Sequence, residues 1–383
     1  MRSFHRRDLF CGQGAFALVL WLGSYAPLLA QTATEPAAPP ASLSTRVDHI
    51  ADQVMARQRL VGLAVGIVDD GQVVHLSGHG FEDREAAVPV SIDTRFRWAS
   101  ISKSLTAIAA MRLVERGKLD LDADCRDYVP EFPDHGPKIR LRHLLSHQSG
   151  IVHYSNGQVV PTVRQYGISH PHANVILALD TFNLSPLLFA PGERFSYTTH
   201  GYILASAVVE RAAGRPFAEH VDRAIARPAG MHGLSPDYPW KDIPHRAAGY
   251  CLRDGEIVPS NEVDVSWKLG GGGYVSTIVD LARYAAAIAN GELLKRETWA
   301  AMWTPAKTNS GEPTGYGLGF QIIEAGEGEA RVGHGGAQEE TRTFMLIRPE
   351  TRDAVVIMSN CEYADPQRIA TRIMNDALPA DER

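Results

Sequence analysis

Ser100 and Lys103 are the residues whose types and spacing most directly suggest chemistry. They stand three positions apart in Arg97–Thr106, where an apolar stretch begins that continues to Val114. This spacing predicts one face of a helix, with a serine near free backbone N–H groups and a lysine able to take its proton. The pattern is typical of serine acyl-transfer enzymes. A helix cap and a solvated charge are the alternative interpretation, but this lysine interrupts small and apolar residues.

Two further segments supply the other groups that a serine nucleophile needs, namely a base, an oxyanion hole and orienting residues. Tyr197 stands at the start of a predicted helix. His334 ends a predicted strand and is followed by Gly335, Gly336 and Ala337. Taken singly, these residues also fit a half-buried tyrosine, a strand-end histidine and a turn. The sequence has no Gly-x-Ser-x-Gly elbow, which argues against an α/β-hydrolase.

Strand patterns occur at both ends of the chain, whereas the middle is dominated by helices and loops. A helix over 42–58 precedes a hairpin, and four strands precede a helix over 366–378. The hairpin strands are predicted at 60–67 and 73–77, and the later strands at 316–323, 330–334, 341–347 and 354–359, with Gly335–Gly336 as a turn. We therefore expect an α+β fold with one antiparallel sheet, flanked by the terminal helices. Residues 42–118 and 291–378 would form this sheet domain, and 119–290 an inserted helical domain.

The helical middle also contains a run of four glycines, Gly270–Gly273. It lacks a following Lys-Ser/Thr and a preceding strand, so it predicts a tight backbone passage and not a phosphate loop. Helices are expected over 140–147 and 197–213, and a third opens at Val275, with Thr277 and Asp280 spaced as a capping box.

The N-terminus has the pattern of an export signal, which we assign to residues 1–30. Three arginines in the first seven residues precede the apolar run Phe16–Leu22, and small residues follow as far as Ala30. The pair Arg6-Arg7 resembles a twin-arginine signal, which implies a periplasmic destination. The run is short for a membrane span, so we expect cleavage and no stable anchor. Residues 31–41 are predicted to be a linker.

Composition narrows the choice of function. The 383 residues are 44% hydrophobic and 21% charged, with a formal net charge of −6 and no basic run, so nucleic acid is not an expected partner. After the signal, Cys125, Cys251 and Cys361 remain and allow at most one disulfide. The cysteines and histidines do not have zinc-site spacing, and we expect no metal or cofactor.

Together, the three segments resemble the serine β-lactamase and penicillin-binding-protein superfamily. The similarity is to its class C-like branch, which includes β-lactamase-related serine hydrolases, family VIII esterases, D-stereospecific peptidases and the mitochondrial serine β-lactamase-like protein. Further segments that look like this branch are His147–Ile151, Gly271–Thr277, Asp280–Tyr284 and Tyr316–Gly319. The resemblance covers residues 44–377 and implies a β-lactamase/transpeptidase-like fold.

The resemblance also implies roles for individual residues. Ser100 would be the nucleophile that forms an acyl-enzyme, with Lys103 beside it. Tyr197, next to that ammonium, would have a lowered phenol pKa and act as base and then as acid. His334 would complete the proton network, and the backbone N–H groups of Ser100 and Ala337 would form the oxyanion hole.

Two departures from the family pattern bear on the substrate. Thr199 replaces a usual asparagine, and Gly335, which precedes Gly336, replaces a threonine or serine that can hold a substrate carboxylate. These positions are expected to border the substrate, and the changes weaken the case for an efficient β-lactamase. Arg342 is a candidate for binding a substrate carboxylate, with a solvated strand end as the alternative.

The sequence therefore predicts an exported serine hydrolase that acts on an amide or ester in a small molecule or peptide. A β-lactamase or DD-peptidase proper is a second interpretation. A third is a penicillin-binding sensor or scaffold that is acylated without turnover. The sequence does not indicate the substrate or the oligomeric state.

Overall fold

The computed structural model describes residues 42–324 and 330–378. The predicted export signal (1–30) and linker (31–41) lie outside the described residues. Within the part that is described, no helix has the length and apolar character needed to cross a bilayer.

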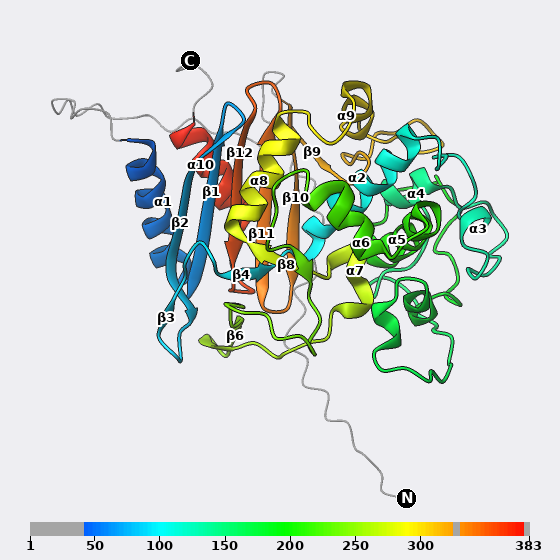
Figure 1. Ribbon diagram of the computed structural model, residues 1–383, viewed down its shortest axis with the longest axis horizontal. Coiled ribbons are helices and arrows are strands. Elements are labelled where there is room, and N and C mark those ends of the chain that lie inside the picture. The colour runs from blue at the N-terminus through cyan, green and yellow to red at the C-terminus, as the bar shows by residue number, and fades with distance from the viewer. Residues whose placement is uncertain (1–41, 325–329, 379–383) are drawn as a thin grey trace, which may run out of the picture.

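Seven strands form one antiparallel sheet in the order β3-β2-β1-β12-β11-β10-β9 (Figure 1). Leu63 in the first strand lies opposite Ser359 in the last, so the C-terminal strands complete the sheet begun by the N-terminal hairpin. The predicted architecture is therefore confirmed. The strands are β1 (Gly62–Asp69), β2 (Gln72–Asp83), β3 (Val88–Pro89), β9 (Gln321–Glu324), β10 (Ala330–Gln338), β11 (Thr341–Arg348) and β12 (Asp353–Ser359).

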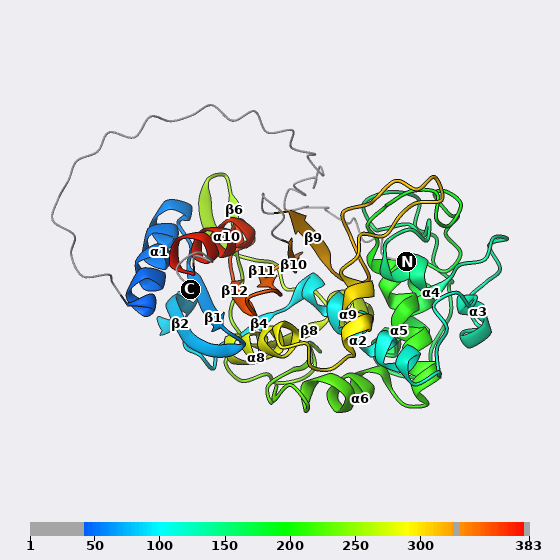
Figure 2. The same cartoon turned by 90° about the horizontal axis from the view of Figure 1, so that it is seen from above.

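Helices cover both faces of this sheet (Figure 2). α1 (Leu43–Gln58) and α10 (Pro366–Ala377) pack on one face, and α8 (Ile278–Ala289) packs on the other. In β1, Leu63 belongs to the core under the terminal helices and Ala64 to the core under α8. Because both faces are covered, β1 is apolar along most of its length and does not alternate with polar residues.

The predicted domain boundary at residue 290 assigns α8 to the helical domain, whereas the helix packs on the sheet. The helix expected to open at Val275 begins at Ile278, because Tyr274–Thr277 form a strand, β8, that pairs with β4 (Arg95–Arg97). Thr277 caps the helix by accepting a hydrogen bond of 3.3 Å from the Asp280 N–H. Since α8 contacts β1, β2 and β12, it packs on the sheet.

The rest of the chain forms the helical region and its connections. Its helices are α2 (Ser102–Glu115), α3 (Cys125–Tyr128), α4 (Leu141–Leu145), α5 (Thr199–Ala213), α6 (Phe217–Val221), α7 (Leu269–Gly272) and α9 (Arg296–Met302). Short turns are η1 (Ala99–Ile101), η2 (Pro171–Ala173), η3 (Leu177–Thr181), the π-helical η4 (Asp222–Ala226) and η5 (Ser266–Lys268). The remaining strands are β5 (Ser235–Pro236), β6 (Tyr250–Arg253) and β7 (Glu256–Pro259).

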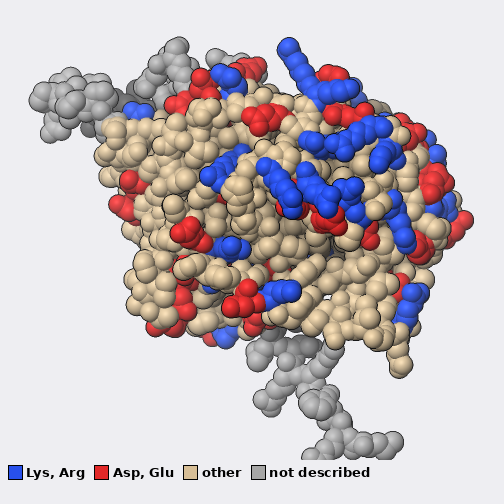
Figure 3. Space-filling model, viewed as in Figure 1, with Lys and Arg blue, Asp and Glu red and all other residues tan. Residues whose placement is uncertain are grey.

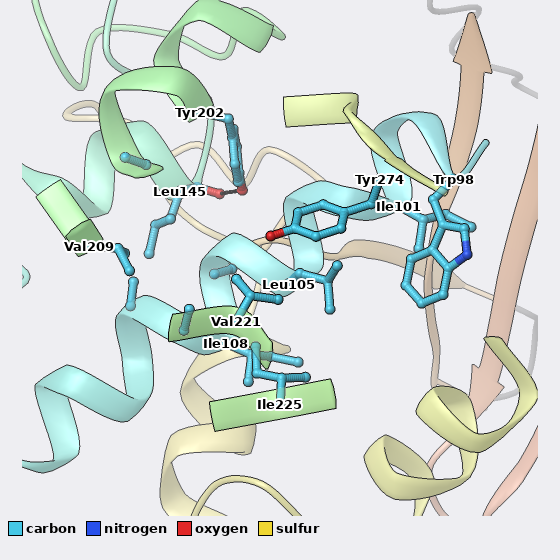
Figure 4. Packing of buried hydrophobic residues seen from close by; sticks show 14 of the residues in the cluster. Trp98, Ile101, Leu105, Ile108, Leu145, Tyr202, Val209, Val221, Ile225 and Tyr274 are labelled. Carbon is cyan, nitrogen blue, oxygen red and sulfur yellow. Dashed lines mark hydrogen bonds between the residues drawn. The ribbon is translucent and has the colours of Figure 1, made fainter. Parts of the chain in front are cut away.

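α2 runs through the centre of the helical region. Leu105 and Ile108 pack towards Val221 and Ile225 (Figure 4), and every residue from Ser102 to Met111 is buried. Burial on all sides explains why the sequence of α2 has no polar face. Lys103, which lies in this buried part of α2, is therefore enclosed by protein.

The predicted turn at Gly335–Gly336 is wrong. Both glycines lie within β10, and the chain reverses at Glu339–Glu340, where Glu340 adopts a left-handed conformation with φ 70°. The glycines are needed for close packing instead of reversal. A Cβ atom at Gly336 would lie 2.4 Å from the Trp98 carbonyl oxygen and 2.1 Å from Thr343 Oγ1.

Basic side chains gather over the helical region in Figure 3, with acidic side chains among them. Exposed ion pairs there include Arg142–Asp122, which contribute little to stability. The three cysteines predicted to remain after the signal are buried, and none of them forms a disulfide with another described residue.

Candidate active site

Ser100 lies in η1, the tight turn that leads into α2. The preceding residue, Ala99, has φ 46°, a strained conformation for a residue with a side chain. Trp98, the residue before Ala99, is held by two backbone hydrogen bonds. Its N–H donates to the Tyr274 carbonyl, and its carbonyl accepts from Thr343 Oγ1. Ser100 itself is half-buried, so the turn presents its side chain at a boundary with solvent.

Lys103 is fully buried behind Ser100. Its Nζ atom lies 3.0 Å from Ser100 Oγ, 3.3 Å from Thr199 Oγ1 and 2.6 Å from the Gly271 carbonyl oxygen. The predicted pairing of Ser100 with Lys103 on one helical face is thus present in the structure. The glycine run places the third acceptor, since a Cβ atom at Gly271 would lie 2.7 Å from Thr199 Cγ2. This agrees with the expected tight backbone passage.

The environment of Lys103 favours a neutral amine. Its three acceptors are two hydroxyl groups and a carbonyl, none of which carries a full negative charge. Burial, and then the nearby charge of Lys268, lower the pKa of Lys103 well below its usual value. An unprotonated amine 3.0 Å from a serine hydroxyl can accept the proton of that hydroxyl.

Tyr197 is also brought to Ser100, but with a different electrostatic character from the one expected. The Lys103 Nζ atom lies over the face of the Tyr197 ring, 4.9 Å from its centroid. Burial raises the pKa of the Tyr197 phenol, although a hydrogen bond with Ser100 opposes this shift. The prediction of a lowered phenol pKa is corrected, because desolvation of the phenolate dominates. A protonated Tyr197 is a proton donor.

Two histidines hold the backbone that follows Tyr197. His147 Nδ1 accepts from the Thr198 N–H at 3.1 Å, and His153 Nδ1 accepts from the Thr199 N–H at 3.2 Å. These donors lie at the start of α5, where N–H groups have no partner inside the helix. Burial lowers the pKa of His153 to about 3 and that of His147 as well, so both are neutral acceptors. The sequence showed His147 only as part of a motif, and no signal indicated His153.

His334 lies in β10 and is buried at the back of the site. Its Nε2 lies 2.8 Å from the Tyr316 hydroxyl, and its Nδ1 lies 2.7 Å from the Gly335 carbonyl oxygen. A carbonyl only accepts, so Nδ1 carries the proton and Nε2 accepts from Tyr316. Burial, and then the charge of Lys103, lower the pKa of His334 to about 3. Tyr316 was predicted to begin a strand, but that strand, β9, begins at Gln321.

The edge of β10 that packs against η1 carries the candidate for the second half of an oxyanion hole. β9 pairs only with Ala330–Gly333, so the next residues of β10 form a free edge. Gln338 and Thr341 flank a two-residue turn and form a hydrogen-bonded pair, so alternate residues, including Ala337, direct their N–H groups away from β11. Ser100 is in the first turn of a helical segment, where N–H groups are also free.

Thr199 and Gly335, the two departures from the family pattern, have different surroundings. Thr199 is buried, and its hydroxyl is shared between Lys103 and the Tyr154 hydroxyl. Gly335 is half-exposed on the free edge, and a Cβ atom there would lie 3.3 Å from the Phe344 ring. Gly336 packs against η1, so it positions the nucleophile.

Arg342 is not brought to this site. Thr341 and Thr343 on either side of it donate to carbonyl groups of Arg97 and Trp98, so strand alternation turns Arg342 to the opposite face. Its Nη1 donates to the carbonyl groups of Gln338 and Thr341 at 2.6 and 2.7 Å. It is therefore not among the residues that we propose for substrate binding.

No group of side chains suited to a metal ion occurs within residues 42–324 and 330–378. The chemistry of the described site rests on the serine, lysine, tyrosine and histidine side chains and on backbone N–H groups.

Comparisons with known proteins agree with this arrangement. A family model described as Beta-lactamase matches residues 47–378. The mitochondrial serine β-lactamase-like protein of Homo sapiens is 29% identical over 384 residues, covering 77% of this chain and 70% of the relative. Esterase EstB of Burkholderia gladioli is 37% identical over 205 residues, covering 50% of this chain and 51% of the esterase.

Solved structures show the same fold. A penicillin-binding protein homologue from Pyrococcus abyssi superposes with a TM-score of 0.71 at 26% identity, covering 87% of this chain and 76% of that chain. The D-amino acid amidase of Ochrobactrum anthropi gives a TM-score of 0.73 at 23% identity, covering 89% of this chain and 100% of that chain. The resemblance and the β-lactamase/transpeptidase-like fold predicted from the sequence are confirmed.

The pairing of Tyr316 with His334 can be tested by Tyr316→Phe. The change leaves buried His334 Nε2 without a donor, so we expect a loss of about 1–3 kcal/mol in the free energy of unfolding and a decrease in kcat/KM of about tenfold or more. Urea unfolding and hydrolysis of a p-nitrophenyl ester measure these quantities.

Tyr284→Phe is the matched control, because it also removes a buried hydroxyl, which lies 2.9 Å from Ser104 Oγ and away from His334. We expect a similar loss of stability with activity retained. Equal activity losses in the two variants would show that the Tyr316 hydroxyl has only a structural role.

Proposed function

Because the chain belongs to the β-lactamase family, we propose that it is a serine hydrolase that cleaves an amide or ester through an acyl-enzyme on Ser100. The observation that carries this proposal is the hydrogen bond of 3.0 Å between Ser100 Oγ and the buried Nζ of Lys103. A buried amine beside a half-exposed hydroxyl is the arrangement that activates a serine nucleophile.

Acylation begins when Ser100 Oγ attacks the carbonyl carbon of the substrate and Lys103 Nζ takes the hydroxyl proton. The negative charge that develops on the carbonyl oxygen is stabilised by the N–H groups of Ser100 and Ala337. The bond to the leaving group then breaks, and the leaving group receives a proton through Lys103 and Tyr197. Tyr197 suits this step, because burial keeps its phenol protonated.

Deacylation repeats the sequence with water in place of Ser100. Water gives a proton to the same amine, attacks the acyl carbonyl and releases the acid, and Ser100 regains its proton. His334 takes no proton in this scheme, since its low pKa keeps it neutral. It fixes Tyr316 and the neighbouring edge of β10.

The substrate class that the site favours is an ester or an amide without a β-lactam ring. Gly335 offers no hydroxyl on the strand edge, and the Thr199 hydroxyl is already engaged by Lys103 and Tyr154. Relatives named as an esterase and as a D-aminopeptidase of Gluconobacter oxydans, which is 26% identical over 324 residues, support this choice. A β-lactamase or DD-peptidase remains the second candidate, because relatives also include penicillin-binding protein 4* of Bacillus subtilis.

Labelling with a fluorophosphonate probe tests the nucleophile. We expect covalent label on Ser100 in the wild-type chain, steady hydrolysis of p-nitrophenyl esters, and loss of both in Ser100→Ala with an unchanged circular dichroism spectrum. Ser102→Ala is the control, since its buried hydroxyl lies two residues away in α2.

The alternatives give other outcomes in the same assay. Stable acylation by labelled penicillin without turnover would indicate a sensor or scaffold, and rapid hydrolysis of nitrocefin would indicate a β-lactamase. Hydrolysis that survives Ser100→Ala would refute the mechanism.

The identity of the base can be tested by the pH dependence of Tyr197→Phe. A base works only when unprotonated, so kcat/KM is expected to fall as the pH drops through the lowered pKa of Lys103. Tyr197→Phe should decrease kcat/KM by about 10²-fold and keep this acid limb. The pKa values of His153 and His334, each about 3, place their titration outside the pH range of the assay.

The kcat/KM profile of a p-nitrophenyl ester, recorded between about pH 5 and 9, measures this effect. If the acid limb disappears in Tyr197→Phe, tyrosinate and not Lys103 is the base.

We further propose that residues 1–30 direct export and are removed. The support is the sequence pattern of arginines, apolar run and small residues that ends at Ala30. We expect periplasmic protein that begins at Gln31, as determined by N-terminal sequencing after expression in a Gram-negative host. Protein that retains Met1 in the membrane fraction would contradict cleavage.

A further inference from the structure

Lys268 is a second buried lysine close to the active site, and the mechanism above does not use it. It ends η5 and directly precedes α7, whose Gly271 carbonyl accepts from Lys103. Only 7% of its surface is exposed. Its Nζ lies 5.9 Å from the centroid of the Tyr154 ring and 5.8 Å from that of Trp267. Within the described residues, this Nζ makes no hydrogen bond or ion pair.

The charged groups around Lys268 leave it without a committed counterion. Asp237 is already bound by Arg97 at 2.6 Å and by Arg246 at 3.1 Å. Glu339, on the turn after β10, is exposed and attracts Lys268 only at longer range. Arg97 repels it, and His153 is neutral. An unpaired buried ammonium is costly unless a ligand supplies the opposite charge.

The surroundings of Lys268 connect it directly to the reacting groups. The Tyr154 hydroxyl hydrogen-bonds to Thr199, and the Thr199 hydroxyl accepts from Lys103 at 3.3 Å. Tyr154 therefore lies between Lys103 and Lys268, with half of its surface exposed to solvent.

Gln338, the residue after the proposed oxyanion donor Ala337, is a second polar residue in this region. Its side chain is about nine-tenths buried and lies against Gly272, since a Cβ atom there would be 3.4 Å from Gln338 Oε1. Within the described part of the chain, Gln338 Nε2 has no hydrogen-bond partner. The buried Gln338 amide, which lacks a hydrogen-bond partner within the described residues, and the Lys268 ammonium are thus two donors available to a ligand beside the nucleophile.

We propose that Lys268, Tyr154 and Gln338 form the subsite for the acyl part of the substrate, and that this subsite selects acyl groups carrying a terminal carboxylate. The carboxylate pairs with Lys268, the Gln338 amide donates to an oxygen of the acyl group, and Tyr154 covers its methylene groups. We assign the acyl side because Gln338 extends the strand edge beyond Ala337, away from Gly335. The inference rests on the proposed hydrolysis at Ser100.

Two esters of equal chain length test this selectivity. Mono-p-nitrophenyl glutarate and p-nitrophenyl valerate share a leaving group and differ at the end of the acyl chain, which is a carboxylate in one and a methyl group in the other. We expect the wild-type chain to prefer the glutarate. Lys268→Met, which keeps the aliphatic stem, should reduce the glutarate-to-valerate ratio of kcat/KM by about tenfold or more, mainly through KM for the glutarate.

Matched variants separate charge at Lys268 from general effects. Lys268→Arg retains the charge and should keep most of the preference. Lys241→Met removes an exposed lysine and should leave the ratio unchanged. An unchanged ratio in folded Lys268→Met would overturn the inference.

The wild-type chain provides a second measurement that does not depend on a variant that folds. Burial lowers the pKa of Lys268 to about 8, with Glu339 and Asp237 opposing the shift and Arg97 adding to it. Only the protonated amine attracts a carboxylate, so the glutarate-to-valerate ratio should fall as the pH rises through about 8. Lys103 affects both esters equally and cancels in the ratio. A ratio independent of pH would overturn the inference.

Failure of the inference is distinguishable from failure of the proposed function. If both esters are hydrolysed and Ser100 is labelled, but wild type shows no preference for the glutarate, only the acyl subsite is wrong. If neither ester is hydrolysed and Ser100 is not labelled, the proposed function fails and the subsite proposal fails with it.

Discussion

The buried amine of Lys103 is the constraint on which the rest of the site depends. A lysine inside a protein is tolerated as a neutral amine or with a counterion, and here its partners are two hydroxyl groups and one carbonyl. The three partners come from η1, α5 and α7, which are far apart in the sequence. Placing one nitrogen among them fixes how these three segments pack, so the geometry that we propose activates Ser100 also specifies the local fold.

Close backbone approach makes this packing possible. Gly271 lets α7 reach Thr199, and Gly336 lets η1 lie against β10, where a methyl group would overlap the Trp98 carbonyl. The strained φ of Ala99 is held in place by the two residues before it, because the carbonyl groups of Arg97 and Trp98 accept from threonines of β11. Strain at the nucleophile is thus supported by hydrogen bonds from the rigid sheet, as expected for a preorganised site.

The sequence was sufficient for the architecture, since strand and helix patterns at both ends of the chain predicted the single sheet and its terminal helices. It was also sufficient for Ser100 and Lys103, because a lysine within an apolar helix is itself a signal. It failed at Gly335–Gly336, where glycine meant close packing and not reversal. It also failed at Val275, where a short strand precedes the cap. Both errors concern contacts between distant segments, which a local pattern does not encode.

The sequence failed to indicate several functional residues for the same reason. Tyr316 was noted only as the start of a family-like segment, whereas His153 and Lys268 gave no signal in the sequence, and their importance arises only when folding removes them from water. Desolvation also reversed the expected electrostatics of Tyr197, whose phenol pKa is raised although a lysine lies over its ring. The expectation assumed an ammonium close to the phenol oxygen.

In the structure the lysine pKa is lowered by the same burial, so a stabilising positive charge is not available to a phenolate. A pair of groups that lose water together shifts towards its neutral state. This coupling is why Lys103 is better suited to accept the Ser100 proton and Tyr197 to donate one.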